Sequence, residues 1–323
     1  MPTSMIRVPE NLLIDFTGKK DVNIRILEEK LKIEIRMKGN ELSLISLDDT
    51  QLELSLKIIN GMIKMIKEGV IFSIQDFENI LIRFTEKGRF KEDFFYYHPV
   101  VKTFLSKNIG CKTLGQLKYV KAMERKRLVI CDGPAGTGKT FLAVAYAIKM
   151  LREEKIERIV LVRPAIEAGE NLGFLPGTYM EKIDPYFKPL YDALLHVLGA
   201  QKVEKYITHK IVEVAPLAYM RGRTLNNSFI ILDEAQNTTF NQLKMFLTRI
   251  GIGSHTVITG DNTQIDLPQS ARPGLKETKQ ILHGIDEVEF IDLDYRDIVR
   301  DSLVQKIILA YDNFNKNSRN KSK

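Results

Sequence analysis

The most informative run in this chain is Gly133-Pro134-Ala135-Gly136-Thr137-Gly138-Lys139-Thr140. It matches the pattern Gly-x-x-x-x-Gly-Lys-Ser/Thr, which forms the phosphate-binding loop of nucleoside triphosphatases. The glycines let backbone N–H groups turn inward around phosphate oxygens, and the following helix adds its positive N-terminal end. In this pattern Lys139 neutralises phosphate oxygens, and the hydroxyl of Thr140 helps to hold Mg²⁺. All eight residues are therefore predicted to line an ATP site.

The flanking residues predict the strand and the helix that such a loop needs. Residues 127–131 are a short apolar run typical of a buried strand, and residues 140–151 are rich in strong helix formers. Further runs rich in β-branched residues follow at 158–162, 211–214, 229–232, 256–258 and 288–291. Because helical segments separate these runs, we expect an α/β P-loop NTPase with a mostly parallel, RecA-like sheet covered on both faces. Ligands of such sheets bind at the carboxyl ends of the strands, where the glycine-rich run lies.

Two carboxylates end one of the predicted strands. Asp233 and Glu234 follow Phe229-Ile-Ile-Leu232, 94 residues after Lys139. Asp233 is expected to hold Mg²⁺ through water, together with Thr140. Glu234 is expected to orient or deprotonate the attacking water. Lys139, Asp233 and Glu234 are therefore candidate catalytic residues.

A third polar strand end is Thr256-Val-Ile-Thr-Gly-Asp-Asn-Thr-Gln264. Asp261 and Gln264 are placed to reach the γ-phosphate or the water, and we assign Gln264 a catalytic role. A strand end capped by its own polar side chains is the alternative interpretation.

Arginine is the other residue type that phosphoryl transfer uses, because it stabilises charge in the transition state. Six arginines lie near predicted strand ends or helix starts: Arg163, Arg221, Arg223, Arg272, Arg296 and Arg300.

Composition limits the class of protein. The chain has 323 residues, 44% of them hydrophobic, and a net charge of +7. The segment 313–323 contributes four of these positive charges, because it holds four basic residues and no acidic one. The remaining charge of about +3 is compatible with nucleic-acid binding but does not argue for it. Two cysteines and five histidines offer no obvious zinc site. No secretory signal and no apolar run of about 18 residues is visible, so we expect a cytoplasmic protein without a membrane partner.

Residues 1–90 predict a small α+β module. We expect a strand at 12–16, a helix at 21–31 with Asp21 as its N-cap, a hairpin of strands 33–37 and 41–45, and a helix at 48–67. The turn Gly18-Lys19-Lys20-Asp21 resembles a degraded GxxG loop of a KH domain, which clamps a nucleic-acid backbone, although the sequence pattern predicts no helix before it. A packing or oligomerisation module is the alternative.

A second candidate for nucleic-acid contact is the segment 169–191, which mixes glycines and prolines with aromatic residues and lysines. Aromatic residues beside lysines suit single-stranded RNA, because bases stack on the rings and phosphates pair with the ammonium groups. A long loop that packs its own aromatic residues is the alternative. The domain boundaries we predict are a KH-like module at 1–90, a linker at 91–126, a P-loop ATPase domain at 127–312 and a basic disordered tail at 313–323.

Together these motifs resemble the PhoH family, specifically the bacterial PhoH-like ATPases without a PIN nuclease domain. Besides the phosphate loop, the resemblance rests on Arg163-Pro164, Leu172-Gly-Phe-Leu-Pro-Gly177, Asp184-Pro185, Ala215–Leu225, Ile231–Thr239, Lys244–Arg249, Thr259–Pro268 and Arg296–Gln305. The N-terminal module also looks like the one in this family.

The resemblance implies further roles. Gln116 matches a glutamine that reads adenine in related ATPases. Asp233-Glu234 and Gly260-Asp-x-x-Gln264 look like motifs of superfamily-one RNA helicases. Arg300 matches a late arginine of the family and is the first choice for an arginine finger. The family also implies RNA metabolism and a small partner endoribonuclease.

The sequence therefore predicts an Mg²⁺-dependent ATPase that acts with single-stranded RNA. Only 59 residues follow Gln264, too few for a second ATPase-like domain. The opposing arginine is then expected from a neighbouring subunit, in a homo-oligomeric ring. Two alternatives remain: a nucleotide-gated scaffold for a nuclease, and a nucleoside kinase.

Overall fold

The computed structural model describes residues 1–67, 77, 81, 98–164, 179–268 and 270–299, with the side chains of 179–185 left out. The described residues form two compact units, one up to His98 and one from Pro99 to Val299, and each is described by itself. No helix in these ranges is long and apolar enough to cross a bilayer.

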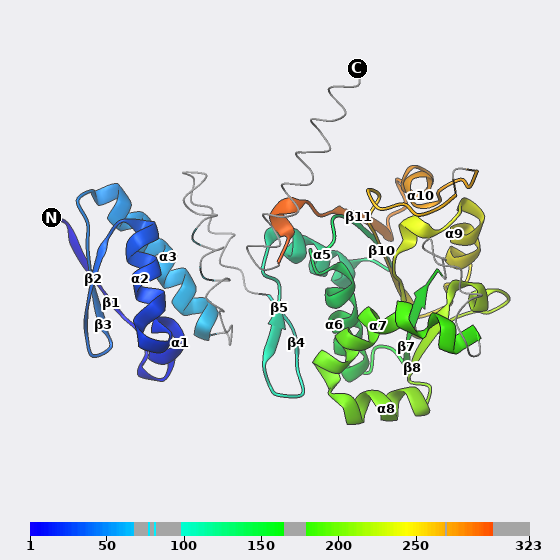
Figure 1. Ribbon diagram of the computed structural model, residues 1–323, viewed down its shortest axis with the longest axis horizontal. Coiled ribbons are helices and arrows are strands. Elements are labelled where there is room, and N and C mark those ends of the chain that lie inside the picture. Colours follow the sequence, from blue (N-terminus) through cyan, green and yellow to red (C-terminus); the bar gives the residue numbers. More distant parts are fainter. Residues whose placement is uncertain (68–76, 78–80, 82–97, 165–178, 269, 300–323) are drawn as a thin grey trace, which may run out of the picture. The chain divides into compact units, whose positions relative to one another are not determined.

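The first unit is an α+β module (Figure 1). Its antiparallel sheet has the order β1-β3-β2, from β1 (Thr3–Arg7), β3 (Glu41–Ile45) and β2 (Glu34–Lys38). Three helices, α1 (Leu13–Thr17), α2 (Val22–Leu31) and α3 (Asp49–Lys67), share a core with it. The predicted hairpin and the two longer helices are confirmed.

The prediction of a strand at residues 12–16 was wrong, because these residues form a 3₁₀ turn (Glu10–Leu12) and helix α1. The first strand is instead β1, near the N-terminus. Helix α1 ends at Gly18, whose φ of 73° lies in the left-handed region that stops a helix. A helix therefore does precede the turn Gly18–Asp21. Asp21 occupies the N-cap position of α2, but its side chain makes no capping hydrogen bond.

The second unit is built on a parallel sheet of six strands with the order β11-β6-β10-β9-β7-β8. The strands are β6 (Leu128–Asp132), β7 (Arg158–Arg163), β8 (Val212–Pro216), β9 (Ser228–Leu232), β10 (His255–Gly260) and β11 (Val288–Asp292). All six predicted strands are present, and the predicted α/β fold with a parallel sheet is confirmed.

Both faces of this sheet are covered, because alternate residues of each strand point to opposite sides. On one side Val129, Ile159 and Ile231 share a core with helices α5 (Leu114–Arg125), α6 (Lys139–Arg152), α7 (Tyr179–Leu198) and α8 (Ala200–Thr208). On the other side Ile130 and Val160 pack with α9 (Phe240–Leu247) and α10 (Leu275–Ile281). The sheet is therefore a buried central layer between two sets of helices (Figure 1).

The segment predicted as a linker contributes to this unit. Its second half holds a hairpin of β4 (Pro99–Lys102) and β5 (Asn108–Gly110), followed by α5. Val101, Ile109 and Leu117 are buried in the same core as α6. Residues from Pro99 onward therefore support the face of the sheet on which α6 lies.

Candidate nucleotide-binding site

The glycine-rich run connects the end of β6 to the start of α6, as a phosphate loop requires. Gly136 and Gly138 have φ values of 83° and 81°, which side chains rarely adopt, and Gly138 is the N-cap of α6. Gly133 lies close to the chain after β11, since a Cβ there would come within 2.6 Å of the Leu293 carbonyl oxygen. The glycines are thus needed where the backbone turns and where two chain segments touch.

The loop is tied to its surroundings through its backbone. The N–H of Gly133 donates to the carbonyl of Gly260 at 3.1 Å, and the N–H of Val299 donates to the carbonyl of Gly136 at 2.9 Å. Within the loop, the Thr137 hydroxyl donates to the Pro134 carbonyl at 2.9 Å. These bonds fix the loop before any ligand binds.

Lys139 lies across the loop. Its ammonium group donates to the carbonyls of Gly133 at 2.6 Å and Pro134 at 2.9 Å. Because an ammonium group has three donors and turns easily, the same side chain can exchange a carbonyl for a phosphate oxygen. The loop and its lysine therefore fit a nucleoside triphosphate.

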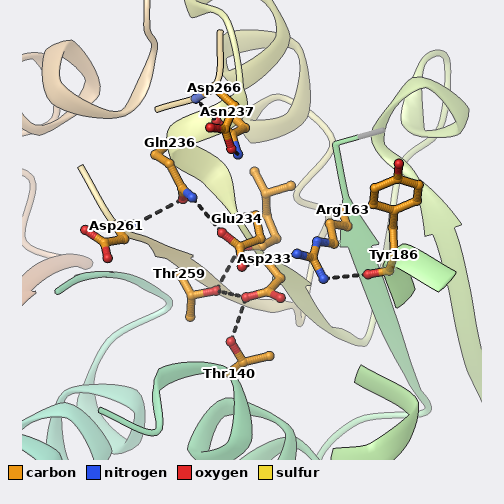
Figure 2. Close-up of polar contacts among 11 residues, drawn as sticks. Thr140, Arg163, Tyr186, Asp233, Glu234, Gln236, Asn237, Thr259, Asp261 and Asp266 are labelled. Carbon is orange, nitrogen blue, oxygen red and sulfur yellow. Dashed lines mark hydrogen bonds and ion pairs between the residues drawn. The ribbon is translucent and has the colours of Figure 1, made fainter. Parts of the chain in front are cut away.

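The two predicted magnesium residues, Thr140 and Asp233, are in direct contact (Figure 2). Asp233, which follows β9 directly, is 4% exposed. Its Oδ1 accepts a hydrogen bond from the Thr140 hydroxyl at 2.7 Å and a second from the Thr259 hydroxyl at 2.6 Å. Thr140 can keep this bond and still offer an oxygen lone pair to a cation. This pair fits Mg²⁺, which commonly takes only one or two protein ligands beside phosphate and water. No larger group of carboxylate, histidine or cysteine ligands occurs in the described part of the chain.

Glu234 follows Asp233 in the chain, but its carboxylate contacts Arg163 and Gln236 rather than Thr140. Its backbone has a φ of 55°, in the left-handed region. Its Oε1 pairs with the Arg163 guanidinium at 3.2 Å, and its Oε2 accepts from the Gln236 amide at 2.6 Å. The predicted water-orienting carboxylate is therefore held by one ion pair and one hydrogen bond (Figure 2).

Gln236 links the ends of β9 and β10. It is buried, and its Oε1 accepts from the backbone N–H of Asp261 at 3.0 Å. Asp261 itself turns its Oδ1 to the N–H and hydroxyl of Thr263, at 3.0 and 2.6 Å. Asp261 Oδ1 therefore caps the strand end, whereas the buried Oδ2 has no hydrogen-bond partner among the described residues, so both interpretations of this motif stay open.

Gln264 and Gln116 lie apart from the carboxylates. Gln264 is exposed, and its backbone N–H donates to the Asp261 carbonyl at 2.9 Å. Gln116 is buried in α5. Its Oε1 accepts a hydrogen bond from the N–H of Lys112 at 2.7 Å, and its Nε2 donates to the carbonyl of Thr137 at 2.9 Å. Both ends of the Gln116 amide are thus engaged with backbone, and in this structure the side chain braces the phosphate loop.

One of the six candidate arginines reaches the site within the described residues. Arg163, at the end of β7, contacts Glu234. Arg223 pairs with Glu213, Arg272 with Glu277 and Arg296 with Asp294. The contact of Glu213 with the Arg223 guanidinium lowers the pKa of that carboxyl. Arg221 is exposed, and Arg300 lies outside the described residues.

The sequence reasoning missed three supporting residues. Thr259 and Gln236 lie inside motifs that were singled out, yet received no role. Asp297 accepts from the Thr113 hydroxyl at 2.6 Å and from the N–H of Gly115 at 3.2 Å, which joins the chain after β11 to the start of α5. Only the strand order, with β10 beside β9, shows that Thr259 is next to Asp233.

A parallel sheet with a phosphate loop after one strand and an Asp-Glu pair after another defines a P-loop nucleotide-binding protein. Comparison with known proteins gives the family. The family model described as PhoH-like protein matches residues 108–312. The chain belongs to the PhoH-like protein family.

Three relatives show how far the similarity extends. A PhoH-like protein of Bacillus subtilis is 46% identical over 311 residues, covering 96% of this chain and 97% of its own length. A PhoH-like protein of Mycobacterium bovis is 44% identical over 308 residues, covering 95% and 87%. The protein PhoH of Escherichia coli is 44% identical over 198 residues, covering 61% of this chain and 56% of its own. The first two alignments therefore take in the N-terminal module as well as the parallel-sheet unit.

Proposed function

We propose that this protein is an Mg²⁺-dependent ATPase that acts with RNA. The observation that carries the proposal is the Asp233 carboxylate, whose Oδ1 accepts hydrogen bonds from Thr140, the last residue of the phosphate loop motif, and from Thr259. This arrangement puts a magnesium-binding hydroxyl, a buried carboxylate and the neighbouring Glu234 at one edge of the sheet.

Each residue has a distinct task in hydrolysis. The loop N–H groups and Lys139 bind the phosphates and offset their charge. Mg²⁺, when bound, supplies charge neutralisation and orients the phosphate oxygens. Asp233 holds the Thr140 hydroxyl in place, and Thr259 holds Asp233. Glu234 accepts a hydrogen bond from the attacking water and orients it toward the γ-phosphate.

RNA as the partner is supported by the module formed by residues up to His98. Its turn Gly18–Asp21 lies between helices α1 and α2, and Lys19 and Lys20 are exposed there. A side chain at Gly18 would meet Asn23 and Val22 at 3.0 Å, and the Asn23 amide donates to the Phe16 carbonyl at 3.0 Å. A rigid turn that starts with glycine and exposes two lysines suits a nucleic-acid backbone. Of the aromatic segment 169–191, residues 169–178 and the side chains of 179–185 lie outside the described residues, and Phe187 is buried in the core, so this segment adds little support.

A homo-oligomeric ring is the second part of the proposal. Arg223, Arg272 and Arg296 are paired with carboxylates of their own unit, so an arginine for the γ-phosphate is expected from a neighbouring subunit. Light scattering with ATP and Mg²⁺ should give a mass of several subunits, and a monodisperse monomer would contradict the ring. A partner endoribonuclease remains a proposal that the family resemblance alone supports.

The deciding experiment is phosphate release from ATP and Mg²⁺, with and without single-stranded RNA. Lys139→Ala should abolish release because it removes the charge that meets the phosphates. The matched control is Lys149→Ala, on the same helix, where the lysine pairs at the surface with Glu124. Release that RNA stimulates and only Lys139→Ala abolishes supports the proposal. ATP binding without turnover would favour the nucleotide-gated scaffold, and phosphate transfer to a nucleoside would favour the kinase.

A further inference from the structure

Glu234, the residue expected to orient water, is restrained by an arginine from a neighbouring strand. Arg163 ends β7, and β7 lies next to β9 with Val162 opposite Leu232. The Arg163 side chain therefore emerges beside the Asp233-Glu234 pair. It is 17% exposed, and its guanidinium group lies 3.2 Å from Oε1 of Glu234. The Glu234 side chain is 37% exposed, so the ion pair is buried on the arginine side and reached by solvent on the glutamate side.

The same guanidinium also contacts a helix. Arg163 donates from Nη1 to the backbone carbonyl of Tyr186 in α7 (Figure 2), and its Nη2 forms the ion pair with Glu234. Because the guanidinium group is planar and rigid, its two contacts are geometrically linked. A shift of α7 relative to β7 therefore changes the contact with Glu234.

This contact limits the orientations in which Glu234 can perform its assigned task, because each carboxylate oxygen already has one partner. To orient a water, the carboxylate must present a lone pair toward the phosphate loop. Here Oε1 faces Arg163 and Oε2 faces Gln236, whereas Thr140, the loop residue at the magnesium position, contacts Asp233 instead. In the part of the chain that the structure describes, no hydrogen bond or ion pair joins Glu234 to the phosphate loop.

We propose that Arg163 is a positioning residue that holds Glu234 out of its water-orienting position until a movement of α7 releases it. The inference rests on the proposed ATPase function and adds a restraint to it. Arg163 is then not an arginine finger, since it stabilises the resting state of the site rather than the transition state. Removing it should speed hydrolysis, whereas removing a finger slows it.

The test is the rate of phosphate release by Arg163→Gln without RNA. We expect kcat to rise roughly tenfold, because the free energy of one contact to a charged group corresponds to a factor of about ten. The affinity for a fluorescent ATP analogue should stay unchanged. The matched control is Arg158→Gln, at the other end of β7, where the side chain bonds to Ser228. This control should keep the wild-type rate. An unchanged or lower kcat in Arg163→Gln would overturn the proposal.

Two further variants keep the test decisive. Arg163→Lys retains the charge but cannot make both contacts of the planar fork, so it should raise kcat in part if Arg163→Gln does not fold. In Glu234→Gln, the additional Arg163→Gln change should have no effect on the rate, because the restrained group is gone. An acceleration that persists in the double variant would overturn the proposal.

Failure of this inference differs from failure of the proposed function. If the wild type hydrolyses ATP in a Lys139-dependent way but Arg163→Gln is no faster, only the restraint is wrong. If the wild type is inactive and Arg163→Gln hydrolyses ATP in a Lys139-dependent way, the restraint is supported. If neither hydrolyses ATP, both are wrong.

Discussion

At the scale of single residues, the hydroxyl of Thr259 in strand β10 holds the carboxylate proposed to position Mg²⁺. It is fully buried and donates to Asp233 at 2.6 Å, sharing this oxygen with Thr140. A buried carboxylate that loses a donor keeps the cost of its desolvation. Thr259 therefore helps to hold the Asp233 carboxylate in place beside Thr140.

We expect Thr259→Val to lower the free energy of unfolding by about 1–3 kcal/mol and to reduce kcat, since Asp233 is then held by one hydroxyl instead of two. Urea denaturation and phosphate release measure the two effects. The matched control is Thr256→Val on the same strand, because the buried Thr256 hydroxyl has no hydrogen-bond partner among the described residues. That change should leave stability unchanged or raise it. Equal losses in both variants would mean that the bond to Asp233 contributes nothing.

At the scale of elements, the chain after β11 connects helix α5 to the phosphate loop. Asp297 accepts from Thr113, the N-cap of α5, and from Gly115 in its first turn. There is no room for a larger residue at Gly115, since a Cβ would lie 2.4 Å from Asp297 Oδ1. Two residues further on, Val299 donates to the loop carbonyl of Gly136. Helix α5 and the loop are therefore fixed by the same short segment.

Asp297→Asn should weaken ATP binding about five- to tenfold. The NH₂ group of the new amide would face an N–H or O–H donor that the carboxylate now accepts from, and this loosens the segment that bonds to the phosphate loop through Val299. Titration with a fluorescent ATP analogue measures the change. Asp292→Asn is the control, since its ion pair with Lys279 is at the surface and contributes little. Wild-type affinity in Asp297→Asn would show that the loop is held without this segment.

The elements also show how far sequence reasoning extends. The six parallel strands were predictable because their apolar runs are long enough and end in polar residues. The conformation of Leu12–Phe16 was not predictable, because a run of four apolar residues and one aspartate fits a strand and a helix equally well. Only tertiary contacts decide between the two. The phosphate loop, Asp233 and Glu234 were predictable from their motifs. The roles of Thr259 and Arg163 depend on which strands are neighbours, and the sequence does not contain the strand order in any local pattern.

At the scale of the whole molecule, the two units have separate hydrophobic cores. One core consists of residues up to Leu81, and the two cores of the parallel-sheet unit begin at Val100 and at Leu128. The proposed ATP and Mg²⁺ contacts all belong to the second unit. Binding to the folded form stabilises only the cooperative unit that contains the site.

We therefore expect ATP with Mg²⁺ to raise the unfolding temperature of the parallel-sheet unit and to leave that of the N-terminal module unchanged. At a ligand concentration about 100 times the dissociation constant, the added stability is about 2.7 kcal/mol. Calorimetry of the full chain, with hydrogen exchange to assign each transition, measures the shift. Lys139→Ala should remove it, and a non-hydrolysable analogue should preserve it. A shift of both transitions by the same amount would mean that the two units unfold as one, so that the nucleotide also stabilises the module proposed to bind RNA.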